Sequence, residues 1–409
     1  MKFANYYFKG KSMNNIGDNM QILAIDYIYQ QMGVQDDIVY IDKNDLPTYE
    51  GEYVVLPVNM PLVDYRENGI AGWFSSKIIP VFFGLTLVKD SLLPEEVVYY
   101  KRFEPIGCRD ERTLNTLRTY GIFAYLNGCI TAALPLRKPN AAKQNKVFLV
   151  DVPESLKLFI PDELKKDAVE MTHLYYDELE DPKQKMKDVY RQYREEARLV
   201  VTSLLHCAVP CMAAGIPVIL AKEKCSYRLG WLEKLLPIYT LEEFPEIQWD
   251  PAPNYYEEQK RKILNIVIDR LKKTYEKYHE ICELSDFYES RNKKEYVIDA
   301  FDSIQQYIDT HWSDREKAYH YSIWGLTQTS SLTVSYISKN YPNAKLCHVY
   351  DKYKKVKFEG LQAQHPSQIE KYPQETVFIT TVSAIEEAQA FFKSIGRSLE
   401  NVAFLYIIK

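Results

Sequence analysis

The stretch ARLVVTSLLHCAVPCMAAGIPVI, residues 197–219, decides the fold class of this chain. Its apolar run at 198–202 predicts a buried strand, residues 205–214 predict a helix, and residues 217–221 predict a second strand. Two buried strands joined by a helix form the βαβ unit of a parallel sheet, in which helices cover both faces. We therefore expect an α/β protein.

The same alternation of strands and helices extends along the rest of the chain. Strands are predicted at residues 3–8, 38–41, 53–57, 78–83, 105–108, 123–126, 146–150, 320–324, 344–350, 376–380 and 402–407. Helices are predicted at residues 18–32, 94–103, 111–120, 182–196, 257–282, 293–310, 332–340 and 384–395.

Three units account for this pattern. We predict a Rossmann-like lobe at residues 1–140, a second Rossmann-like lobe with long C-terminal helices at 141–314, and a small Rossmann-like domain at 315–409. The polar stretch 138–145 is the expected hinge between the first two units. We expect a C-terminal helix of the second lobe to cross back to the first lobe.

Composition excludes several classes of protein. With 46% hydrophobic and 26% charged residues, the chain is globular rather than disordered. Its net charge of −5 gives no general attraction to nucleic acid or anionic lipid. No apolar run reaches the roughly 20 residues of a membrane span, and residues 1–10 lack the apolar core of a secretory signal. We expect a cytoplasmic protein.

The seven cysteines follow no metal or disulfide pattern. There is no CxxC and no Cys/His pairing at zinc spacing. Cys207 and Cys211 lie one helical turn apart within an apolar helix, where a free cysteine behaves as a small buried hydrophobe. We predict reduced, mostly packed thiols and no metal site.

Polar residues end the central strand and begin the next helix. Thr202 and Ser203 are the last residues of the predicted strand, and His206 lies in the first turn of the helix. Ligands of open α/β sheets bind beyond the carboxyl ends of the strands, and a helix N-terminus favours an anion. These residues are therefore candidates for binding an anionic substrate, with His206 also a candidate acid. The alternative is a structural histidine.

A second strand end carries Arg109 and Asp110. The planar fork of arginine suits a carboxylate or a phosphate, so Arg109 is a candidate anion clamp. Asp110 directly precedes a predicted helix and is interpreted as its N-cap.

Two further strand-to-helix junctions repeat this pattern. Asn15, Gly17 and Asp18 join the first strand to the first helix, and the glycine allows close backbone approach while the polar side chains can hold hydroxyl groups. Asn127 and Thr131 follow the strand at 123–126. Each of these signals is weak by itself.

The C-terminal domain carries a weaker indication of nucleotide binding. Its first strand is followed by Gly325 and a hydroxyl-rich loop with Thr327, and its second strand ends at Asp351, where a ribose would lie. The dinucleotide fingerprint requires more glycines than this loop contains, so NAD binding is not expected. A purely structural Rossmann unit is the alternative.

Taken in order, four motifs resemble those of a known family. They are Asn15-Ile-Gly-Asp18, Gly107-Cys-Arg-Asp110, Gly128-Cys-Ile-Thr131, and Ser203-Leu-Leu-His206 followed by Gly215-Ile-Pro-Val218. In this order the chain resembles the polysaccharide pyruvyl transferase family over roughly residues 1–250. The resemblance implies two lobes similar to GT-B glycosyltransferases, phosphoenolpyruvate as donor, a sugar diol as acceptor and no obligatory metal or other cofactor.

One position departs from the family pattern. The family usually has an arginine before Leu-His, and that arginine helps to hold the donor, whereas this chain has Leu204. Arg228 or Lys222 could replace it, the donor could differ, or the site could be inactive.

The resemblance leads to a specific hypothesis about the reaction. A pyruvyl transferase moves the enolpyruvyl group of phosphoenolpyruvate onto a sugar diol, forming a pyruvate ketal in surface polysaccharide biosynthesis. His206 is assigned as acid or phosphate ligand, Arg109 as anion clamp, and Asp18 with Asn15 as acceptor contacts or base. The acceptor is expected to be nucleotide- or lipid-linked, with at most peripheral association with the polysaccharide assembly machinery.

Two other functions fit the same scaffold. One is a GT-B-type glycosyltransferase that uses a nucleotide sugar, although its usual pair of glutamates seven residues apart is not evident after the second-lobe loop. The other is a noncatalytic scaffold of the same pathway, in which Leu204 marks lost catalysis.

Overall fold

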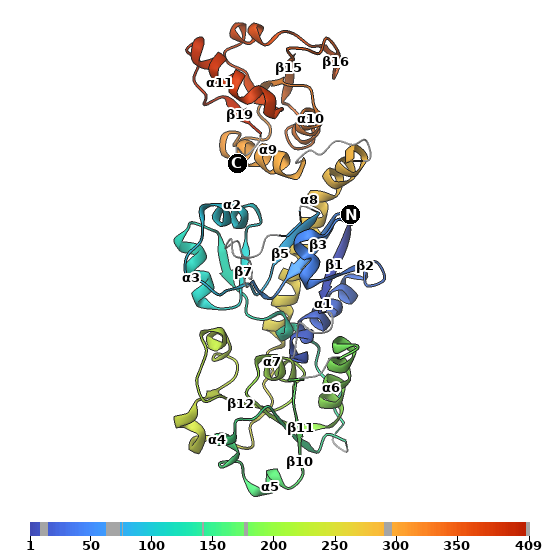
Figure 1. The fold of residues 1–409 in the computed structure, drawn as a ribbon, viewed down its shortest axis with the longest axis vertical. Coiled ribbons are helices and arrows are strands. Elements are labelled where there is room, and N and C mark those ends of the chain that lie inside the picture. Colours follow the sequence, from blue (N-terminus) through green and yellow to red (C-terminus); the bar gives the residue numbers. More distant parts are fainter. Residues whose placement is uncertain are drawn as a thin grey trace. The chain divides into compact units, whose positions relative to one another are not determined.

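The computed structural model describes residues 1–8, 15–62, 74–75, 77–140, 143–175, 179–289 and 297–405. It contains two compact units, Met1–Glu276 and Lys277–Lys409, and the boundary between them falls inside one long helix (Figure 1). The first unit contains both of the lobes expected from the sequence up to that helix, and each unit is described separately below.

The first sheet of unit 1 is entirely parallel. Its strand order is β2 (Ile38–Asp42), β1 (Lys2–Tyr7), β3 (Val54–Val58) and β5 (Ile78–Phe82). Every residue of β3 and β5 is buried, as expected for continuous apolar strands covered on both faces. Helix α1 (Asn19–Met32) follows β1 through the short 3-10 helix η2 (Ile16–Asp18).

Shorter elements complete the first lobe. The parallel pairs are β4 (Pro61–Leu62) with β6 (Thr86–Leu87) and β7 (Ile106–Cys108) with β8 (Ala124–Leu126). The helices are α2 (Pro94–Arg102) and α3 (Glu111–Thr119). Asp110 caps α3 by accepting a 2.8 Å hydrogen bond from the backbone N–H of Thr113, so its interpretation as an N-cap is confirmed.

A second parallel sheet forms the other lobe of unit 1. Its order is β10 (Ala168–Met171), β9 (Lys146–Val150), β11 (Ala197–Thr202), β12 (Val218–Ala221) and β13 (Ile238–Tyr239). Two short helices, α4 (Glu154–Lys157) and α5 (Asp162–Lys165), precede β10, while α6 (Pro182–Glu196) and α7 (Leu205–Ala213) flank β11 along the chain. Residues of β9, β11 and β12 share one core with Phe244.

Helix α8 (Glu257–Glu289) begins after the second sheet and returns to the first lobe. The Arg270 guanidinium donates to the carbonyl oxygen of Phe82 at 3.1 Å and to the Tyr125 hydroxyl at 3.2 Å. The Tyr275 hydroxyl donates to the carbonyl oxygen of Met1 at 3.0 Å. These bonds confirm the expected crossing of a C-terminal helix back to the first lobe.

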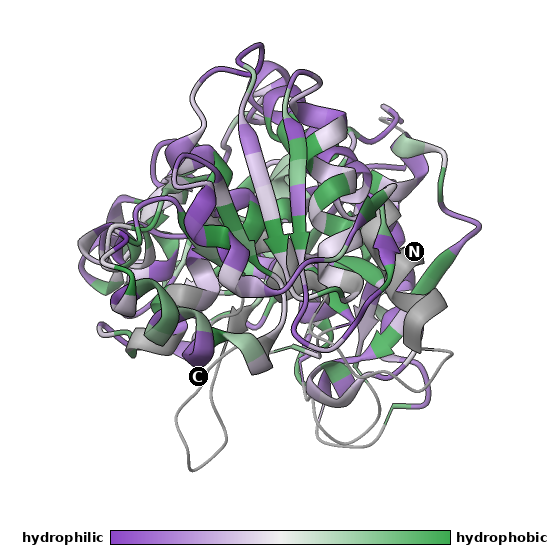
Figure 2. Cartoon of the chain, turned by 90° about the horizontal axis from the view of Figure 1, so that it is seen from above, coloured by the Kyte–Doolittle hydropathy of each residue, from purple (hydrophilic) through white to green (hydrophobic). Residues whose placement is uncertain are grey.

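Unit 2 contains a third parallel sheet. Its order is β15 (Lys345–Tyr350), β14 (His320–Trp324), β18 (Thr376–Ile379) and β19 (Val402–Phe404). The helices α9 (Val297–His311), α10 (Gln328–Asn340) and α11 (Ile385–Ser394) accompany it, with a small hairpin of β16 (Lys357–Phe358) and β17 (Leu361–Gln362). Across the whole chain, Figure 2 shows hydrophobic and hydrophilic residues mixed within helices and strands, and many of the loops are hydrophilic.

The α/β class and the parallel sheets are confirmed, and most predicted elements agree with the observed ones within one or two residues. Helix α10 begins at Gln328 rather than at residue 332, because the Ser330 hydroxyl accepts a 2.7 Å bond from the N–H of Thr327 and closes an earlier first turn. Strand β10 was missed, since it lies at the edge of its sheet and none of its residues is fully buried. Residues 141–142 of the predicted hinge, 293–296 of a predicted helix and 406–407 of a predicted strand lie outside the described residues.

Candidate active site at the strand ends of unit 1

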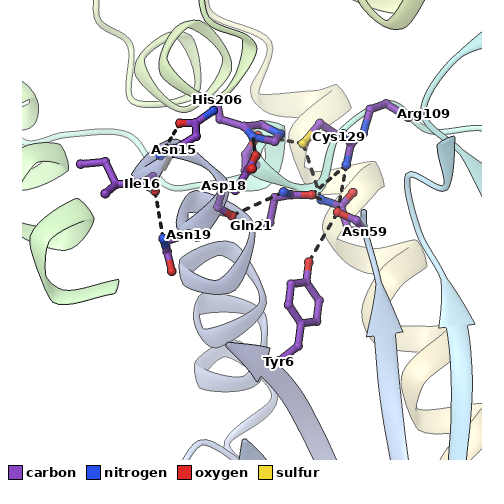
Figure 3. A network of polar contacts seen from close by, with 12 residues as sticks. Tyr6, Asn15, Ile16, Asp18, Asn19, Gln21, Asn59, Arg109, Cys129 and His206 are labelled. Atoms are coloured by element: carbon purple, nitrogen blue, oxygen red, sulfur yellow. Dashed lines mark hydrogen bonds and ion pairs between the residues drawn. The ribbon is translucent and has the colours of Figure 1, made fainter. Parts of the chain in front are cut away.

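A network of polar side chains gathers at the carboxyl ends of the parallel strands of unit 1 (Figure 3). Asp18 follows β1 through η2, Arg109 follows β7, Cys129 follows β8, and His206 lies in the first turn of α7 after β11. All four strands pair in parallel with a neighbour. Each of these residues therefore follows the carboxyl end of a parallel strand, which is where α/β proteins bind ligands.

The His206–Asp18 pair joins the two lobes. His206 Nδ1 lies 2.8 Å from Asp18 Oδ1, across 188 positions of sequence. The His206 side chain is 7% exposed and that of Asp18 is 28% exposed, so the carboxylate is the part of the pair open to solvent. Burial acts to lower the pKa of His206, but its hydrogen bonds to Asp18 and Cys129 outweigh that effect and raise it. Likewise, burial acts to raise the pKa of Asp18, and His206 and Arg109 lower it.

Gly17 permits the close approach on which this pair depends. A Cβ at this position would lie 2.9 Å from Asn15 Oδ1, 2.9 Å from His173 Nδ1 and 3.5 Å from His206 Cβ. The Asn15 side chain itself accepts a 2.9 Å bond from the Gly17 N–H and so caps η2. Asn15 therefore shapes the turn that presents Asp18.

Arg109 is fully buried and lacks a hydrogen-bonded carboxylate partner among the described residues. Its Nη2 donates to Gln21 Oε1 at 2.8 Å and to the carbonyl oxygen of Asn59 at 2.9 Å. Nε and Nη1 have no hydrogen-bond partner within the described part of the chain. A buried guanidinium bonded only to neutral groups is costly, so these two free nitrogens are available to an anion.

Cys129 lies between these cationic groups. Its sulfur accepts a 3.1 Å bond from the Thr131 hydroxyl and a 3.6 Å bond from the Asn59 amide. In Figure 3 the His206 ring lies between the Asp18 carboxylate and this sulfur. Burial acts to raise the pKa of Cys129, but the charge of Arg109 and the hydrogen bond with His206 lower it to about 5.

Further cations surround this network. Arg228, in the 3-10 helix η5 (Tyr227–Leu232), is partly exposed; burial and the charge of Arg109 lower its pKa, and Asp18 acts to raise it. Lys43 directly follows β2. Burial lowers the pKa of Lys43, and the charge of Asp18 acts to raise it. Lys222 donates a 2.8 Å bond to the carbonyl oxygen of Ser203, and the charge of Arg228 acts to lower its pKa. Both bases considered as replacements at the Leu204 position therefore lie near the strand ends.

The remaining predicted residues of unit 1 make internal hydrogen bonds. Thr202 Oγ1 accepts from the N–H of Leu204 at 3.1 Å, and the Ser203 hydroxyl donates to the carbonyl oxygen of Asp151 at 2.7 Å. Asn127 Oδ1 accepts from the N–H of Gly84 at 3.1 Å. These side chains fix the loops around the site, and Thr131 contributes its hydroxyl to the Cys129 sulfur.

The candidate nucleotide residues of unit 2 form a network of their own. Asp351 accepts hydrogen bonds from the N–H groups of Leu326, Tyr353 and Lys354 at 3.0, 2.9 and 2.8 Å. The Thr327 hydroxyl donates to the carbonyl oxygen of Thr380 at 2.6 Å. Gly325 adopts φ +98°, and a Cβ there would lie 2.4 Å from Thr381 Cγ2. These residues lie in unit 2, and the His206 network lies in unit 1.

Four polar residues of the site were not predicted from the sequence: Gln21, Lys43, Asn59 and His173. Three of them follow strand ends: Lys43 after β2, Asn59 after β3 and His173 after β10. Ligands of α/β sheets bind at such ends, so inspection of every predicted strand end would have found Lys43 and Asn59. His173 would still have been missed, because β10 was not predicted. Gln21 lies one helical turn after Asp18 and shares its helix face. Cys129 was quoted in a motif but was given no role.

Within the described residues, no group of three or more His, Cys, Asp or Glu side chains is arranged to hold a metal ion. No helix in the described ranges is both long enough and apolar enough to cross a bilayer.

Parallel sheets with buried cations and a His–Asp pair at their strand ends define a class: an α/β protein with a site suited to an anionic substrate. The family model of the polysaccharide pyruvyl transferases matches residues 15–221, about half of the 409-residue chain. The chain belongs to the polysaccharide pyruvyl transferase family. Membership implies a transferase that acts on polysaccharides, with a sugar polymer as acceptor. No significant match exists among curated proteins.

Several solved structures show a distant likeness. An uncharacterised protein of Klebsiella pneumoniae has 13% identity, with 57% of this chain and 87% of that chain covered and a TM-score of 0.35. The structure of accessory secretory proteins 1, 2 and 3 of Streptococcus pneumoniae has 15% identity, with 66% of this chain and 58% of that chain covered and a TM-score of 0.27. The wall teichoic acid polymerase TagF has 11% identity, with 68% of this chain and 90% of that chain covered and a TM-score of 0.32. Likenesses this distant support no conclusion about lobe arrangement or function.

Proposed function

We propose that this protein transfers the enolpyruvyl group of phosphoenolpyruvate to a sugar diol, forming a pyruvate ketal during surface polysaccharide biosynthesis. The proposal includes two lobes of unit 1 arranged as in GT-B enzymes, no metal or other cofactor, a nucleotide- or lipid-linked acceptor, and a cytoplasmic location with at most peripheral association with the assembly machinery. The observation that carries it is the His206–Asp18 pair set among buried or partly buried cations.

The charges of the site match such a donor. Phosphoenolpyruvate carries a carboxylate and a phosphate, so its site must concentrate positive charge on a protein whose net charge is −5. Arg228 and Lys43 bring positive charge close enough to Asp18 to affect pKa values, and Arg228 is partly exposed. Arg109 keeps Nε and Nη1 free of partners within the described residues. Together they offer an anion both accessible contacts and a buried positive field.

His206 is suited to supply the proton. Ketal formation begins when an acid protonates the methylene carbon of the donor, which leaves the neighbouring carbon electron-poor. Asp18 holds Nδ1 and favours the imidazolium, while the ring also hydrogen-bonds with the buried Cys129 sulfur. The remaining ring proton is therefore held at Cys129 until the donor arrives.

Two hydroxyl groups of the acceptor complete the reaction. The first forms a bond to the electron-poor carbon and gives its proton to Asp18, the exposed member of the pair. The second forms another bond to the same carbon and returns a proton to His206 as the bond to the phosphate oxygen breaks, and Asp18 gives its proton to the departing phosphate. Inorganic phosphate leaves, and the cyclic ketal remains.

Phosphate release from phosphoenolpyruvate plus acceptor tests the assignment. We expect Arg109→Ala and His206→Ala each to lower the rate by roughly tenfold or more, because each removes a charge or a proton donor from the reacting centre. The exposed Arg198 and His320 provide matched controls, and their alanine variants should keep the wild-type rate. Full activity in both site variants, with folding verified by circular dichroism, would discard the assignment.

A ligand comparison separates the main rival. Phosphoenolpyruvate should raise the Tm of the full chain, whereas nucleotide sugars should not. The opposite result would favour a glycosyltransferase, and no shift with any anionic ligand would favour a noncatalytic scaffold.

A further inference from the structure

We propose that Cys129 is a thiolate that serves as the counter-ion of Arg109 and His206 while no donor is bound, and that it takes up a proton when an anionic donor replaces it. The second half of this inference rests on the proposed function, because it requires an anionic donor. The first half concerns the free protein alone.

The hydrogen bonds of Cys129 show that its sulfur is an acceptor. The Asn59 amide nitrogen, 3.6 Å from the sulfur, can only donate, and the Thr131 hydroxyl donates from 3.1 Å. Asn59 cannot rotate its amide freely, since its oxygen accepts from the N–H of Ile130 at 3.1 Å and its nitrogen also donates to Gln21 at 3.0 Å. Neutral thiols are weak acceptors, whereas a thiolate is a strong one.

The surroundings of Arg109 require a negative charge. The guanidinium is fully buried, and its two hydrogen bonds within the described residues go to the neutral Gln21 side chain and an Asn59 carbonyl oxygen. The adjacent Asp110 uses its carboxylate to cap α3 and to bond the hydroxyls of Thr86 and Thr113. An isolated buried guanidinium would carry a large desolvation cost. Cys129 and Asp18 are two acidic groups whose charges interact with that of Arg109.

The other charged and titratable neighbours of the sulfur support the same ionisation state. His206 hydrogen-bonds with Cys129 on one side, and Arg228 adds positive charge from η5. The Tyr6 and Tyr256 hydroxyls also interact with the sulfur, but burial raises the pKa of both, so they remain neutral. Burial acts against ionisation of Cys129, and the cations lower its pKa to about 5 nevertheless.

Donor binding then becomes a charge exchange. The donor brings a carboxylate and a phosphate to the nitrogens of Arg109 and to His206, which were balanced by the sulfur. Because the added negative charge disfavours a second anion, the sulfur binds one proton from solvent and becomes a neutral thiol. No bond to carbon forms at sulfur and no electron is transferred. One proton is taken up for each donor bound.

Thiolate absorbance tests the free protein. Thiolates absorb at about 240 nm and thiols do not, so the wild-type chain should gain one thiolate's absorbance as the pH rises through about 5. Cys129→Ser should lack this step, because a serine hydroxyl keeps the acceptor position but does not ionise. Cys225→Ser, at an exposed thiol, should retain it. Absence of the step in the wild type overturns the proposal.

Thermal stability gives a second measurement that does not depend on absorbance. The pKa of Cys129 is about 5 when folded, below its ordinary value of 9.0, so its ionisation stabilises the fold above the ordinary value and that gain is lost as the pH falls towards 5. The Tm of the wild type should exceed that of Cys129→Ser most above about pH 9, and the difference should disappear below pH 5. A difference that does not change with pH would contradict a thiolate.

Calorimetry with phosphoenolpyruvate tests the exchange. The titrations are made at about pH 7.5, between the pKa of Cys129 in the folded protein and the ordinary pKa of a thiol. Repeating them in buffers of different ionisation enthalpy gives the number of protons bound. The wild type should take up one proton per donor, and Cys129→Ser should take up none. Binding without proton uptake overturns the exchange. A donor that produces no heat refutes both the exchange and the proposed function, while the absorbance step still decides the counter-ion.

Discussion

The junction between β11 and α7 in unit 1 and the junction between β14 and α10 in unit 2 both lead from a parallel strand into a helix past polar residues. In unit 1 the junction presents His206, which bonds Asp18 from another strand end, beside a buried Arg109 whose Nε and Nη1 have no hydrogen-bond partner among the described residues. At the unit 2 junction, Asp351 and Thr327 bond backbone groups of neighbouring loops. The two junctions therefore hold similar positions in their sheets. They differ in whether their polar side chains are left for a ligand or are bonded to the backbone.

The difference shows what distinguishes a site from a well-closed loop. A buried polar group without a partner costs about 1–3 kcal/mol, so a fold that keeps several together has a reason other than stability. Unit 1 keeps such atoms on Arg109 and on His173, whose charge interacts with that of His206. The loop of unit 2 instead gains stability from its internal bonds. Topological position alone therefore does not indicate chemistry.

The largest expected effect compares the two histidine–carboxylate pairs. His206 pairs with Asp18 in unit 1, and His348 pairs with Glu375 at 2.8 Å in unit 2. We expect His206→Gln to lower kcat by about 100-fold, the loss typical of a removed general acid, and His348→Gln to keep it within about twofold. Phosphate release measured on both folded variants checks this. Equal losses would mean that the two pairs do not differ in function.

The strand-end rule predicted Asp18, Arg109 and His206 from the sequence, because it needs only a strand, its end and a polar residue. Their pairing could not be predicted, since the 2.8 Å contact between Asp18 and His206 depends on how two lobes pack across 188 positions. Cys129 was assigned to packing for a similar reason. Its own neighbours in sequence are apolar or neutral, and the cations that change its ionisation come from other strands.

A smaller effect is expected when a methyl group is added at each junction. In Gly17→Ala the new Cβ would approach Asn15 Oδ1 and His173 Nδ1 at 2.9 Å, displacing Asp18 from His206, and we expect activity to fall by about tenfold. In Gly325→Ala the new Cβ would meet Thr381 at 2.4 Å with φ at +98°, costing about 1–3 kcal/mol of stability. Activity and Tm measured together separate the two. A Gly17→Ala variant with wild-type kcat would show that the pair tolerates displacement.

The pH dependence of activity distinguishes the roles of the two carboxylates, Asp18 and Glu375. Asp18 raises the pKa of His206, so neutral asparagine should lower it. Because the acid is active while protonated, the activity of the wild type should fall as pH rises through this pKa, and in Asp18→Asn the fall should begin at lower pH. The variant should also be slower than the wild type by about tenfold or more at every pH, because it lacks the base for the first hydroxyl. Glu375→Gln should leave the profile unchanged. A profile unaltered by Asp18→Asn would remove His206 as the acid.

The smallest expected effect lies in unit 2. Asp351→Ala removes the acceptor of three backbone N–H groups, from Leu326, Tyr353 and Lys354, and should lower the Tm of the full chain by about 2–4 °C without changing kcat. Because the carboxylate is already bonded to backbone, nucleotide sugars should not raise the Tm of either form through this loop. If a nucleotide sugar stabilises the wild type but not Asp351→Ala, the carboxylate exchanges its backbone bonds for a ribose, and the second junction is a binding site that closes when empty.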